Sequence, residues 1–468
     1  LASGGVAPKV IVGLGGQTPL KLSGLIDPAL IAGTSPHSID LAEDREKWNQ
    51  LCDSLSIPQP PGGTAVTFAE ASVIAQRVGY PVLVRPSYVL GGRAMQIVHD
   101  AQALESAMDQ MARDGSLGKE GGLSAERPVL IDHFLEDATE VDVDAIRDHT
   151  GEVLIGGVME HVEEAGVHSG DSACAIPPQT LPAWVVEVIS AYTTAIANSL
   201  DVRGLINVQF AVLGTTVFVI EANPRASRTV PFVSKASGVA LAKAAARISV
   251  GTTIKELRES GILPASGDGI AKGVSVKEAV LPWNRFRRTD GRGVDAVLGP
   301  EMRSTGEVMG ISPTFGESYA KSQIAAFGPL PKTGTVFISL ADKDKETGIE
   351  PALGFSELGF HILATDGTAD FLRTKGIECT TVRKHSEGTG TLGEKTIVDI
   401  INAGEIDLVI NTPVGRGTRA DGWAIRTAAV QRSIPCITTT AGFSAAVDAV
   451  RFLQASPLSI KSLQEWLA

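Results

Sequence analysis

The sequence predicts a multidomain protein of mixed α/β and α+β class. Apolar runs rich in Val and Ile alternate with stretches of helical period along the chain, as in proteins that combine strands and helices. From about residue 334 this alternation becomes strict, with one helix after each strand. The length of 468 residues exceeds what one hydrophobic core serves, so roughly two to four domains are expected.

In the first part of the chain, short apolar runs predict strands at 9–14, 81–86, 129–135, 140–146, 152–158, 206–213 and 217–222. The strands between 139 and 222 follow one another almost directly. Leu-Gly-Thr-Thr at 213–216 has the length and the glycine of a tight hairpin turn. An antiparallel sheet is therefore expected here, interrupted by one helix at 182–200.

The last part of the chain predicts a doubly wound domain with a parallel sheet. Its strands are expected at 335–340, 361–365, 379–382, 408–412 and 435–439, each followed by a helix. One of these helices is expected to begin at Asp366. The segment 325–334, which contains Gly and Pro, is the natural hinge before this domain.

Charge and cysteine content narrow the classes of function. A net charge of -12, from 41 Lys+Arg and 53 Asp+Glu, argues against a surface that neutralises nucleic-acid phosphates or anionic lipid. The four cysteines lie far apart without a C-x-x-C pair, so neither a zinc knuckle nor a disulfide framework is expected. A reducing cytoplasm is the predicted location. No apolar run reaches the ~18–20 residues of a membrane span.

The segment VIEANPRASRTVP (219–231) begins as a buried strand and ends in polar side chains. Alternate spacing places Glu221 and Asn223 on one face of the strand end, and Gln209 lies at the matching level of the hairpin partner. Their oxygen atoms would then converge. Ligands that offer only oxygen suit Mg²⁺, so the sequence predicts a divalent-metal site here.

Arg225 and Arg228 follow directly after this strand. Guanidinium groups in that place suit the neutralisation of charge on a phosphoryl group in transfer. The alternative is a solvated strand end whose acid pairs with a neighbouring arginine. The segment alone leaves both interpretations open.

Three further segments carry polar candidates. Arg85 ends a strand before a glycine loop at 91–93, whose backbone can approach phosphates without a Cβ clash. The extended segment 133–135 offers backbone groups to an adenine edge, with Glu140 within reach of a ribose. His168 lies in a polar loop where an imidazole can contact phosphate or substrate. Taken alone, these segments also fit a turn, a buried strand and a structural histidine.

Together these segments resemble the ATP-grasp fold and, more closely, the second, C-terminal synthetic half of the large chain of carbamoyl phosphate synthetase. The resemblance extends over essentially the whole chain. It rests on ordered blocks at 33–48, 79–95, 160–173, 203–212, 220–239 and 298–311, among them GVHSGDSA and IEANPRASRTVP. It implies a partial pre-ATP-grasp domain at 1–44, an ATP-grasp domain at 45–262, a connecting segment at 263–331 and a methylglyoxal-synthase-like regulatory domain at 332–468.

The resemblance also implies roles for individual residues. Contacts to ATP would come from Arg45, Arg85, His133, Leu135, Glu140, Gly166, Val167, His168, Ser169, Gln209 and Glu221. A Mg²⁺ or Mn²⁺ ion would be held by Gln209, Glu221 and Asn223, and K⁺ is a further cofactor of the family. Catalytic contacts to carbamate and the migrating phosphoryl group would come from Arg225, Arg228 and His168. The Gly-rich loops at 91–93 and 115–122 are expected lids.

The regulatory domain is expected to bind a small-molecule effector at its strand ends. Thr365 and Thr368 lie at a helix start, a place that suits an anion. Lys345, Lys384 and Asn411 would complete a phosphate pocket. The alternative is that Thr365 and Asp366 merely cap the helix.

The function implied by the resemblance is ATP-dependent phosphorylation of carbamate to carbamoyl phosphate, which feeds pyrimidine and arginine biosynthesis. The implied partners are the first synthetic half of the large chain and a glutaminase small subunit, with neither nucleic acid nor membrane. Two alternatives stay open. One is another ATP-grasp ligase that forms an acyl phosphate, and the other is a nucleotide-sensing module without turnover.

Overall fold

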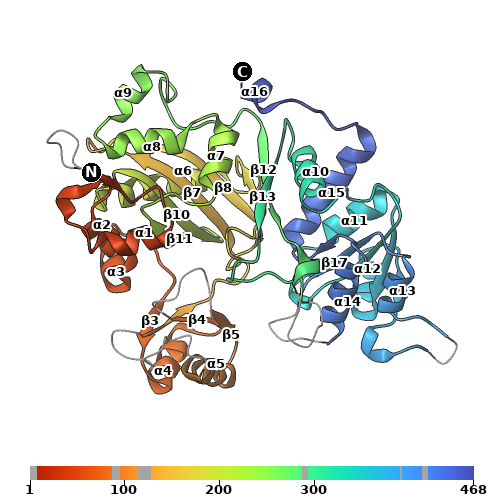
Figure 1. Cartoon of the computed structure of the whole chain (residues 1–468). Coiled ribbons are helices and arrows are strands. Elements are labelled where there is room, and N and C mark those ends of the chain that lie inside the picture. The colour runs from red at the N-terminus through yellow and green to blue at the C-terminus, as the bar shows by residue number, and fades with distance from the viewer. Residues whose placement is uncertain are drawn as a thin grey trace. The chain divides into compact units, whose positions relative to one another are not determined.

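The computed structural model describes residues 8–86, 95–113, 128–286, 294–390, 393–413 and 420–467, and the predicted lids at 91–93 and 115–122 lie outside these ranges. The chain divides into two compact units (Figure 1). The first unit comprises Leu1–Ser169, Cys174–Val274 and Lys461–Ala468, and the second comprises Gly170–Ala173 and Ser275–Ile460. Among the described residues, no helix combines the length and the apolar character needed to cross a membrane.

The first unit contains two small sheets, one large sheet and helices. Its strands are β1 (Val10–Ile11), β2 (Ile31–Ala32), β3 (Gly62–Ala65), β4 (Val82–Pro86), β5 (Gln96–Val98), β6 (Val129–His133), β7 (Thr139–Arg147), β8 (Val153–Glu164), β9 (Cys174–Ile176), β10 (Gly204–Leu213) and β11 (Thr216–Asn223). Its helices are α1 (Gln17–Ser23), α2 (Pro36–Glu43), α3 (Arg45–Ser54), α4 (Phe68–Val78), α5 (Ala101–Arg113), α6 (Ala183–Ser199), α7 (Val230–Ser237), α8 (Leu241–Ser249), α9 (Ile254–Glu259) and α16 (Leu463–Leu467).

The large sheet of the first unit has its strands in the order β11-β10-β7-β8-β9, and all neighbouring pairs are antiparallel. The predicted antiparallel sheet is thus confirmed. The hairpin is also confirmed, because Leu213 pairs with Thr216 across the turn between β10 and β11. The predicted helix at 182–200 is α6.

Period-two alternation gives this sheet one apolar and one polar face. Apolar side chains of β7, β10 and α6 form one core cluster: Val141, Val143, Ala145, Ile206, Val208, Phe210, Val185, Ile189 and Ile196. The residues between them on β7 and β10 are polar, among them Asp142, Asp144, Asn207 and Gln209. Packing of the apolar face therefore fixes which residues the opposite face presents.

A smaller antiparallel sheet has the order β3-β6-β4-β5, with α4 and α5 packed on it (Figure 1). The predicted strands at 81–86 and 129–135 belong to it as β4 and β6. The short strands β3 and β5 were not predicted, since they give too few residues for a periodic signal. β1 is shorter than the predicted 9–14 because the backbone turns after it, with the amide of Gly15 bonded to the carbonyl of Val12.

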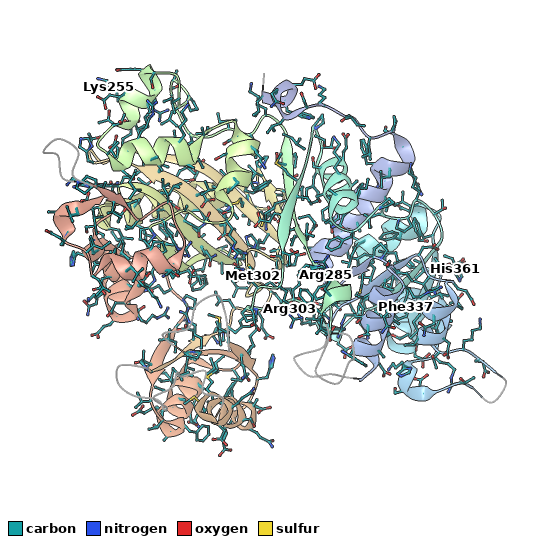
Figure 2. All side chains as sticks on the ribbon, in the orientation of Figure 1. Lys255, Arg285, Met302, Arg303, Phe337 and His361 are labelled. Carbon is teal, nitrogen blue, oxygen red and sulfur yellow. The ribbon has the colours of Figure 1, made fainter. Side chains whose placement is uncertain are left out.

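The second unit has a five-stranded parallel sheet. Its elements are β12 (Val274–Val280), β13 (Gly306–Ser312), α10 (Phe315–Ala326), β14 (Thr335–Ser339), α11 (Ile349–Glu357), β15 (His361–Thr365), α12 (Asp366–Thr374), β16 (Thr380–Val382), α13 (Ile397–Ala403), β17 (Leu408–Asn411), α14 (Ala420–Gln431), β18 (Cys436–Ile437) and α15 (Thr440–Ala455). The strand order is β16-β15-β14-β17-β18, with every pair parallel. Phe337 of β14 is fully buried in its core (Figure 2).

This order confirms the predicted doubly wound domain. The chain builds the sheet outward from β14 in one direction, then returns to the other side of β14 with β17. In such sheets, ligands bind outside the carboxyl ends of the strands at this reversal point. The carboxyl ends of β14, β15 and β17 carry Ser339, Thr365 and Asn411.

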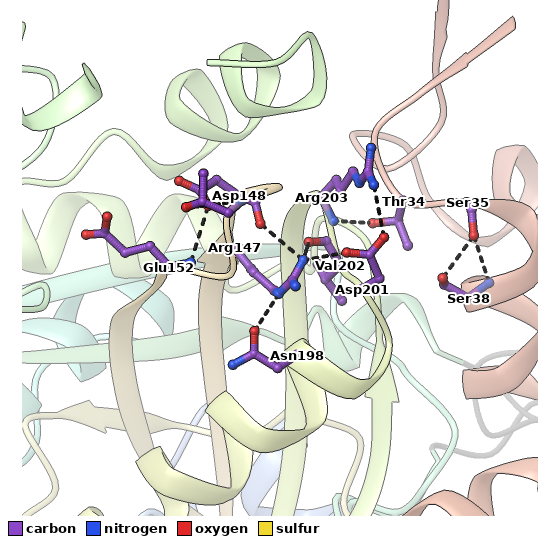
Figure 3. A network of polar contacts seen from close by, with 11 residues as sticks. Thr34, Ser35, Ser38, Arg147, Asp148, Glu152, Asn198, Asp201, Val202 and Arg203 are labelled. Atoms are coloured by element: carbon purple, nitrogen blue, oxygen red, sulfur yellow. Dashed lines mark hydrogen bonds and ion pairs between the residues drawn. The ribbon is translucent and has the colours of Figure 1, made fainter. Parts of the chain in front are cut away.

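Arg147, the last residue of β7, is buried and forms a network of hydrogen bonds at this end of the strand (Figure 3). Arg147 donates to Asn198 Oδ1 at 2.7 Å, to Asp201 Oδ1 at 2.9 Å, and to the carbonyl oxygens of Asp148 and Val202 at 3.1 and 2.8 Å. These bonds join the end of β7 to the turn that links α6 with β10. Such a network stabilises the fold because the buried guanidinium finds four acceptors, and because the buried carbonyl of Val202 receives a donor.

We expect Arg147→Met to lower the free energy of unfolding by about 3 kcal/mol, since it removes four hydrogen bonds and leaves the buried carbonyl of Val202 without this donor. Urea unfolding followed by circular dichroism measures the change. Arg203→Met is the matched control, because Arg203 is half exposed and its guanidinium bonds, within the described part of the chain, only the exposed Asp201. Equal effects of the two substitutions would contradict this account.

Candidate active site

The carboxyl end of β11 brings the predicted metal ligands together. Gln209 pairs in register with Glu221, and Asn207 pairs with Asn223. Asn223 Nδ2 donates to Glu221 Oε1 at 2.8 Å. Gln209 Nε2 lies 3.5 Å from the hydroxyl of Ser169. Three oxygen-bearing side chains thus gather on one face at the strand end.

The arginine that follows this strand contacts the amide rather than the acid. Arg225 Nη2 donates to Asn223 Oδ1 at 3.1 Å, and its Nε donates to Gln17 Oε1 at 2.9 Å. Glu221 forms no ion pair within the described part of the chain, so the alternative of an acid paired with its neighbouring arginine is not observed. Burial lowers the pKa of Arg225, against the opposing effect of Glu221.

The adjacent strand β7 adds three acids to the same face. Glu140, Asp142 and Asp144 lie opposite Ala211, Gln209 and Asn207 of β10. All three are buried. Sequence analysis did not single out Asp142 and Asp144, although the alternation in EVDVDA was a visible signal for a polar strand face.

The polar row continues from Asp142 across the sheet. His161 Nε2 lies 3.4 Å from Asp142 Oδ2, and Cys174 pairs with His161 in register. Burial alone would lower the pKa of His161, but Cys174 and Asp142 raise it well above its ordinary value. Asp142 Oδ1 has no hydrogen-bond partner among the described residues. An unsatisfied buried carboxylate oxygen opposite Gln209 makes this face attractive to a cation.

Glu140 fixes the start of the predicted nucleotide loop. Its Oε2 accepts from the amide of Gly166 at 3.0 Å. Gly166 has φ +89°, and a Cβ there would lie 2.8 Å from Phe134 Cε2, so only glycine fits. Val167 follows with its amide bonded to the carbonyl of Glu164. The pKa of Glu140 is raised to about 7, mainly because the carboxyl is buried; His161 and the bond from Gly166 oppose the rise, and Asp142 and Glu221 add to it.

The same loop continues through His168 and Ser169, which are both half-buried, to a second anchor. Asp171 is fully buried and accepts from the amides of Arg303 and Ser304 at 2.7 and 2.8 Å; Figure 2 labels Arg303. Sequence analysis did not predict this contact because the two segments lie more than a hundred residues apart. The loop is therefore held at both of its ends.

Two of the predicted ATP contacts share one buried acid. Arg45 at the start of α3 pairs with Asp132 Oδ1, and Arg85 of β4 lies 3.5 Å from Asp132 Oδ2. Burial lowers the pKa of Arg45, while Asp132 raises it. Asp132 was not predicted. It draws two guanidinium groups together, an arrangement that suits the binding of phosphate oxygens.

The segment 133–135 is held through its backbone. The amides of His133 and Phe134 donate to the carbonyls of Pro61 and Pro81, and His133 Nδ1 lies 3.1 Å from the carbonyl of Gly79. The side chain of Leu135 is buried with Ala138 and Ala211. Any contact of Leu135 with a ligand must therefore come from its backbone.

In the second unit, most predicted effector residues lie around the strand ends. The hydroxyls of Ser339 and Thr365 are 3.3 Å apart. Thr365 occupies the N-cap position of α12 but makes no side-chain capping bond, so the capping alternative is wrong for this residue. Thr368 Oγ1 accepts from the amide of Leu340 at 3.1 Å. Lys345 Nζ lies 2.8 Å from Asp342 and 5.9 Å from the ring centroid of Phe371.

The remaining effector residues differ in their surroundings. Asn411 is buried, and its Nδ2 lies 3.4 Å from the carbonyl of Ser339 while its Oδ1 accepts from Arg426. Arg426, which sequence analysis missed, also binds both carboxylate oxygens of Asp295 at 2.6 and 2.7 Å. Lys384 is exposed, two residues beyond β16.

Two segments of the chain match models of protein families. Residues 44–257 match the family described as carbamoyl-phosphate synthase L chain, ATP binding domain, and residues 348–438 match the MGS-like domain. The chain is 56% identical, over 98% of its length, to the carbamoyl phosphate synthase large chain of Streptomyces coelicolor. It is 54% identical, over 97% of its length, to that of Mycobacterium bovis. It spans 41% of the length of each of these relatives.

Solved structures show the fold at a greater distance. The biotin carboxylase of Campylobacter jejuni matches with a TM-score of 0.52 and 16% identity, covering 68% of this chain and 73% of that one. The biotin carboxylase domain of the Hydrogenobacter thermophilus 2-oxoglutarate carboxylase matches with the same TM-score and identity, covering 66% and 70%. The predicted fold class is thereby confirmed.

The unliganded protein is expected to lose stability as pH rises between about 4.5 and about 7, because folding raises the pKa of Glu140 from 4.5 to about 7. Between these two pH values the folded state binds more protons than the unfolded state. Above about pH 7 the carboxyl is ionised while buried, which lowers the free energy of unfolding. Glu140→Gln keeps an acceptor for Gly166 and is expected to flatten this slope, as measured by urea unfolding at about pH 5 and about pH 8.

Glu136→Gln is the control for this measurement, since Glu136 is exposed in the loop before β7. It should leave the pH dependence of unfolding as it is in the wild-type protein. If Glu140→Gln shows the wild-type slope as well, burial of this carboxyl is not what costs stability.

Proposed function

The chain belongs to the family of carbamoyl phosphate synthase large chains, and from this premise we propose that it transfers the γ-phosphoryl group of ATP to carbamate. The observation that carries the proposal is the polar strand end. Gln209 and Glu221 face each other in register, and Asn223 and Arg225 continue the same row. A row of oxygen donors that ends in a guanidinium suits a metal-bound triphosphate.

The donor set at the strand end fits a divalent cation. Gln209, Glu221 and Asn223 offer carboxylate and amide oxygens, the ligands that Mg²⁺ prefers, and Mn²⁺ accepts the same set. When bound, such an ion neutralises charge on the β- and γ-phosphates. The buried Asp142 Oδ1, which has no hydrogen-bond partner among the described residues, adds negative potential beside this set. We propose K⁺ as a further cofactor on the basis of the family.

The arginines after β11 provide the positive charge at the reacting end. Arg225 is held by Asn223 and Gln17, and Arg228 is exposed three residues further on. We propose that both face the carbamate anion and the transferring phosphoryl group, with His168 from the opposite loop. In the reaction, a carbamate oxygen forms a bond to the γ-phosphorus while the bond from that phosphorus to the bridging oxygen of ADP breaks. Carbamate is already an anion, so no general base is needed.

The remaining predicted contacts hold the nucleotide. Arg45 and Arg85, gathered by Asp132, would bind phosphate oxygens. Within 133–135, the amides of His133 and Phe134 already donate to protein carbonyls, so the backbone of Leu135 would pair with adenine. Glu140 would accept from ribose hydroxyls. The loop from Gly166 through Val167 and Ser169 would close beside the phosphates, since its amide at Gly166 is already fixed by Glu140.

The wider setting is also a proposal. The relatives are large chains of a synthase, and the chain spans 41% of their length. We propose as partners the first synthetic half of the large chain and a glutaminase small subunit. We further propose that the protein acts in the cytoplasm and that its product enters pyrimidine and arginine biosynthesis. The four cysteines are all free thiols, which agrees with a reducing compartment. The domain boundaries at 44, 262 and 331 remain part of this proposal.

For the second unit we propose regulation by a phosphorylated small molecule. The pocket would lie at the carboxyl ends of β14, β15 and β17, where the strand order reverses. Thr365 carries a hydroxyl that is not used as a cap, and Lys345 supplies positive charge near the start of α12. Thr368, Asn411 and Lys384 would complete the set.

The reverse reaction tests the catalytic proposal directly. The purified chain with Mg²⁺, ADP and carbamoyl phosphate is expected to form ATP, and Glu221→Ala is expected to reduce the rate by about 10²-fold or more, because it removes an anionic metal ligand. ATP formation is measured by a coupled assay.

Glu187→Ala, which changes an exposed acid on the outer side of α6, serves as the control and should keep the wild-type rate. ADP binding without any ATP formation would overturn the proposal that this chain catalyses on its own. ATP-dependent turnover with another carboxylate acceptor, but none with carbamoyl phosphate, would support a different ATP-grasp ligase instead.

The effector proposal predicts that Lys345→Met weakens the binding of inorganic phosphate, used as a probe of the pocket, roughly tenfold, since a charge-assisted contact to phosphate is lost. Isothermal titration calorimetry measures the affinity. Lys343→Met is the matched control, because Lys343 lies two residues away and pairs with Asp344. Equal affinities of wild type and Lys345→Met would remove Lys345 from the pocket.

A further inference from the structure

Asp144 is the most deeply buried acid near the candidate active site. It lies on β7 with a fully buried side chain. It is not one of the predicted metal ligands, and its register partner Asn207 donates to its Oδ1 at 3.0 Å. A carboxylate without access to solvent is costly, so its hydrogen bonds indicate what it is for.

The other two hydrogen bonds to Asp144 come from the residues that precede and follow Arg228 in the sequence. Ser227 Oγ donates to Asp144 Oδ1 at 2.7 Å, and Thr229 Oγ1 donates to Asp144 Oδ2 at 2.7 Å. Between these two residues lies Arg228, which is exposed, while Thr229 is buried. The chain on each side of the exposed arginine is therefore tied to one buried carboxylate.

Two further hydrogen bonds, made by backbone amides, hold the segment 226–230. The amide of Val230 donates to Ser227 Oγ at 3.2 Å, so the hydroxyl that bonds Asp144 also receives the first amide of α7. On the other side, the amide of Ala226 donates to the carbonyl of Gly13 at 2.7 Å. These bonds leave residues 226–230 few ways to move relative to β7, provided that the carboxylate is present.

A carboxylate suits this place better than an amide. Asn207, Ser227 and Thr229 all present hydrogen-bond donors, and an ionised aspartate is an acceptor at both of its oxygens. An asparagine would offer one acceptor oxygen and one donor nitrogen in place of two acceptor oxygens, so a hydroxyl that now donates to Asp144 would have to accept instead, and the negative charge would be lost. The negative charge also favours the cationic form of Arg225 nearby.

We propose that Asp144 is a positioning residue for phosphoryl transfer, which holds Arg228 in place through Ser227 and Thr229 without touching the substrate itself. The inference rests on the proposed function, since it takes Arg228 to be the group that meets the phosphoryl oxygen. Misplacement of a charge-stabilising group by about 1 Å is enough to cost about 10²-fold in rate. The loss of Asp144 is thus expected to act on the chemical step rather than on nucleotide binding.

The test compares Asp144→Asn with Asp148→Asn in ATP formation from MgADP and carbamoyl phosphate. Asp148, which Figure 3 labels, is an equally buried aspartate just beyond the same strand. It accepts from Thr150, Glu152 and Ile254 and, among the described residues, from none at 226–230. Asp144→Asn is expected to lower kcat by about 10²-fold with KM for MgADP near the wild-type value. Asp148→Asn is expected to lower thermal stability but to keep kcat.

A double-mutant cycle with Arg228→Gln separates positioning from a general structural effect. If Asp144 acts through Arg228, adding Asp144→Asn to Arg228→Gln should cost little beyond the single substitution. Thr229→Val, which removes one of the two hydroxyl bonds, should fall between wild type and Asp144→Asn. Full multiplication of the two losses, or a wild-type kcat in Asp144→Asn, would overturn the proposal.

A second readout keeps this inference separate from the proposed function. Amide hydrogen exchange at residues 225–230 is expected to rise in Asp144→Asn and to stay unchanged in Asp148→Asn. If the wild-type chain forms no ATP, the proposed function fails and this exchange measurement alone decides whether Asp144 holds the segment. Unchanged exchange in Asp144→Asn would then refute the positioning role.

Discussion

The register between β10 and β11 is the constraint on which the candidate active site depends. It sets Gln209 opposite Glu221 and Asn207 opposite Asn223, so that oxygen donors from two strands meet on one face. A slip by one residue would carry one partner to the opposite, apolar face, which packs against α6. The apolar cluster of Val143, Val208 and their neighbours therefore protects the polar face by making any other register costly.

The second feature of the site is a group of buried carboxylates that the fold keeps despite their cost. Glu140 and Asp144 lie four residues apart on β7, and burial raises the pKa of Glu140 to about 7 and that of Asp144 to about 6. Each is bonded to a different segment: Glu140 to the loop that starts at Gly166, and Asp144 to the segment around Arg228. One strand thus fixes the two loops between which ATP and carbamate would react.

Much of this arrangement could be predicted from the sequence, because the signals are local. Alternation fixed the polar face of β11, the turn at 213–216 implied the hairpin, and together they placed Gln209 beside Glu221. The parallel sheet of the second unit followed from the strict order of strands and helices. Contacts between distant segments could not be predicted in this way. Asp132, which gathers Arg45 and Arg85, and Asp295, which binds Arg426, owe their roles to tertiary packing alone.

We propose that Gln209, Glu221 and Asn223 hold a divalent cation between the protein and the nucleotide phosphates. The most direct measurement is a crystal structure of the chain with Mn²⁺ and ADP, with the metal located by anomalous scattering. The account predicts a peak at roughly 2.2 Å from oxygens of these side chains, the distance expected for a bound ion of this kind. A nucleotide-bound Mn²⁺ peak out of coordination range of all three side chains would contradict it.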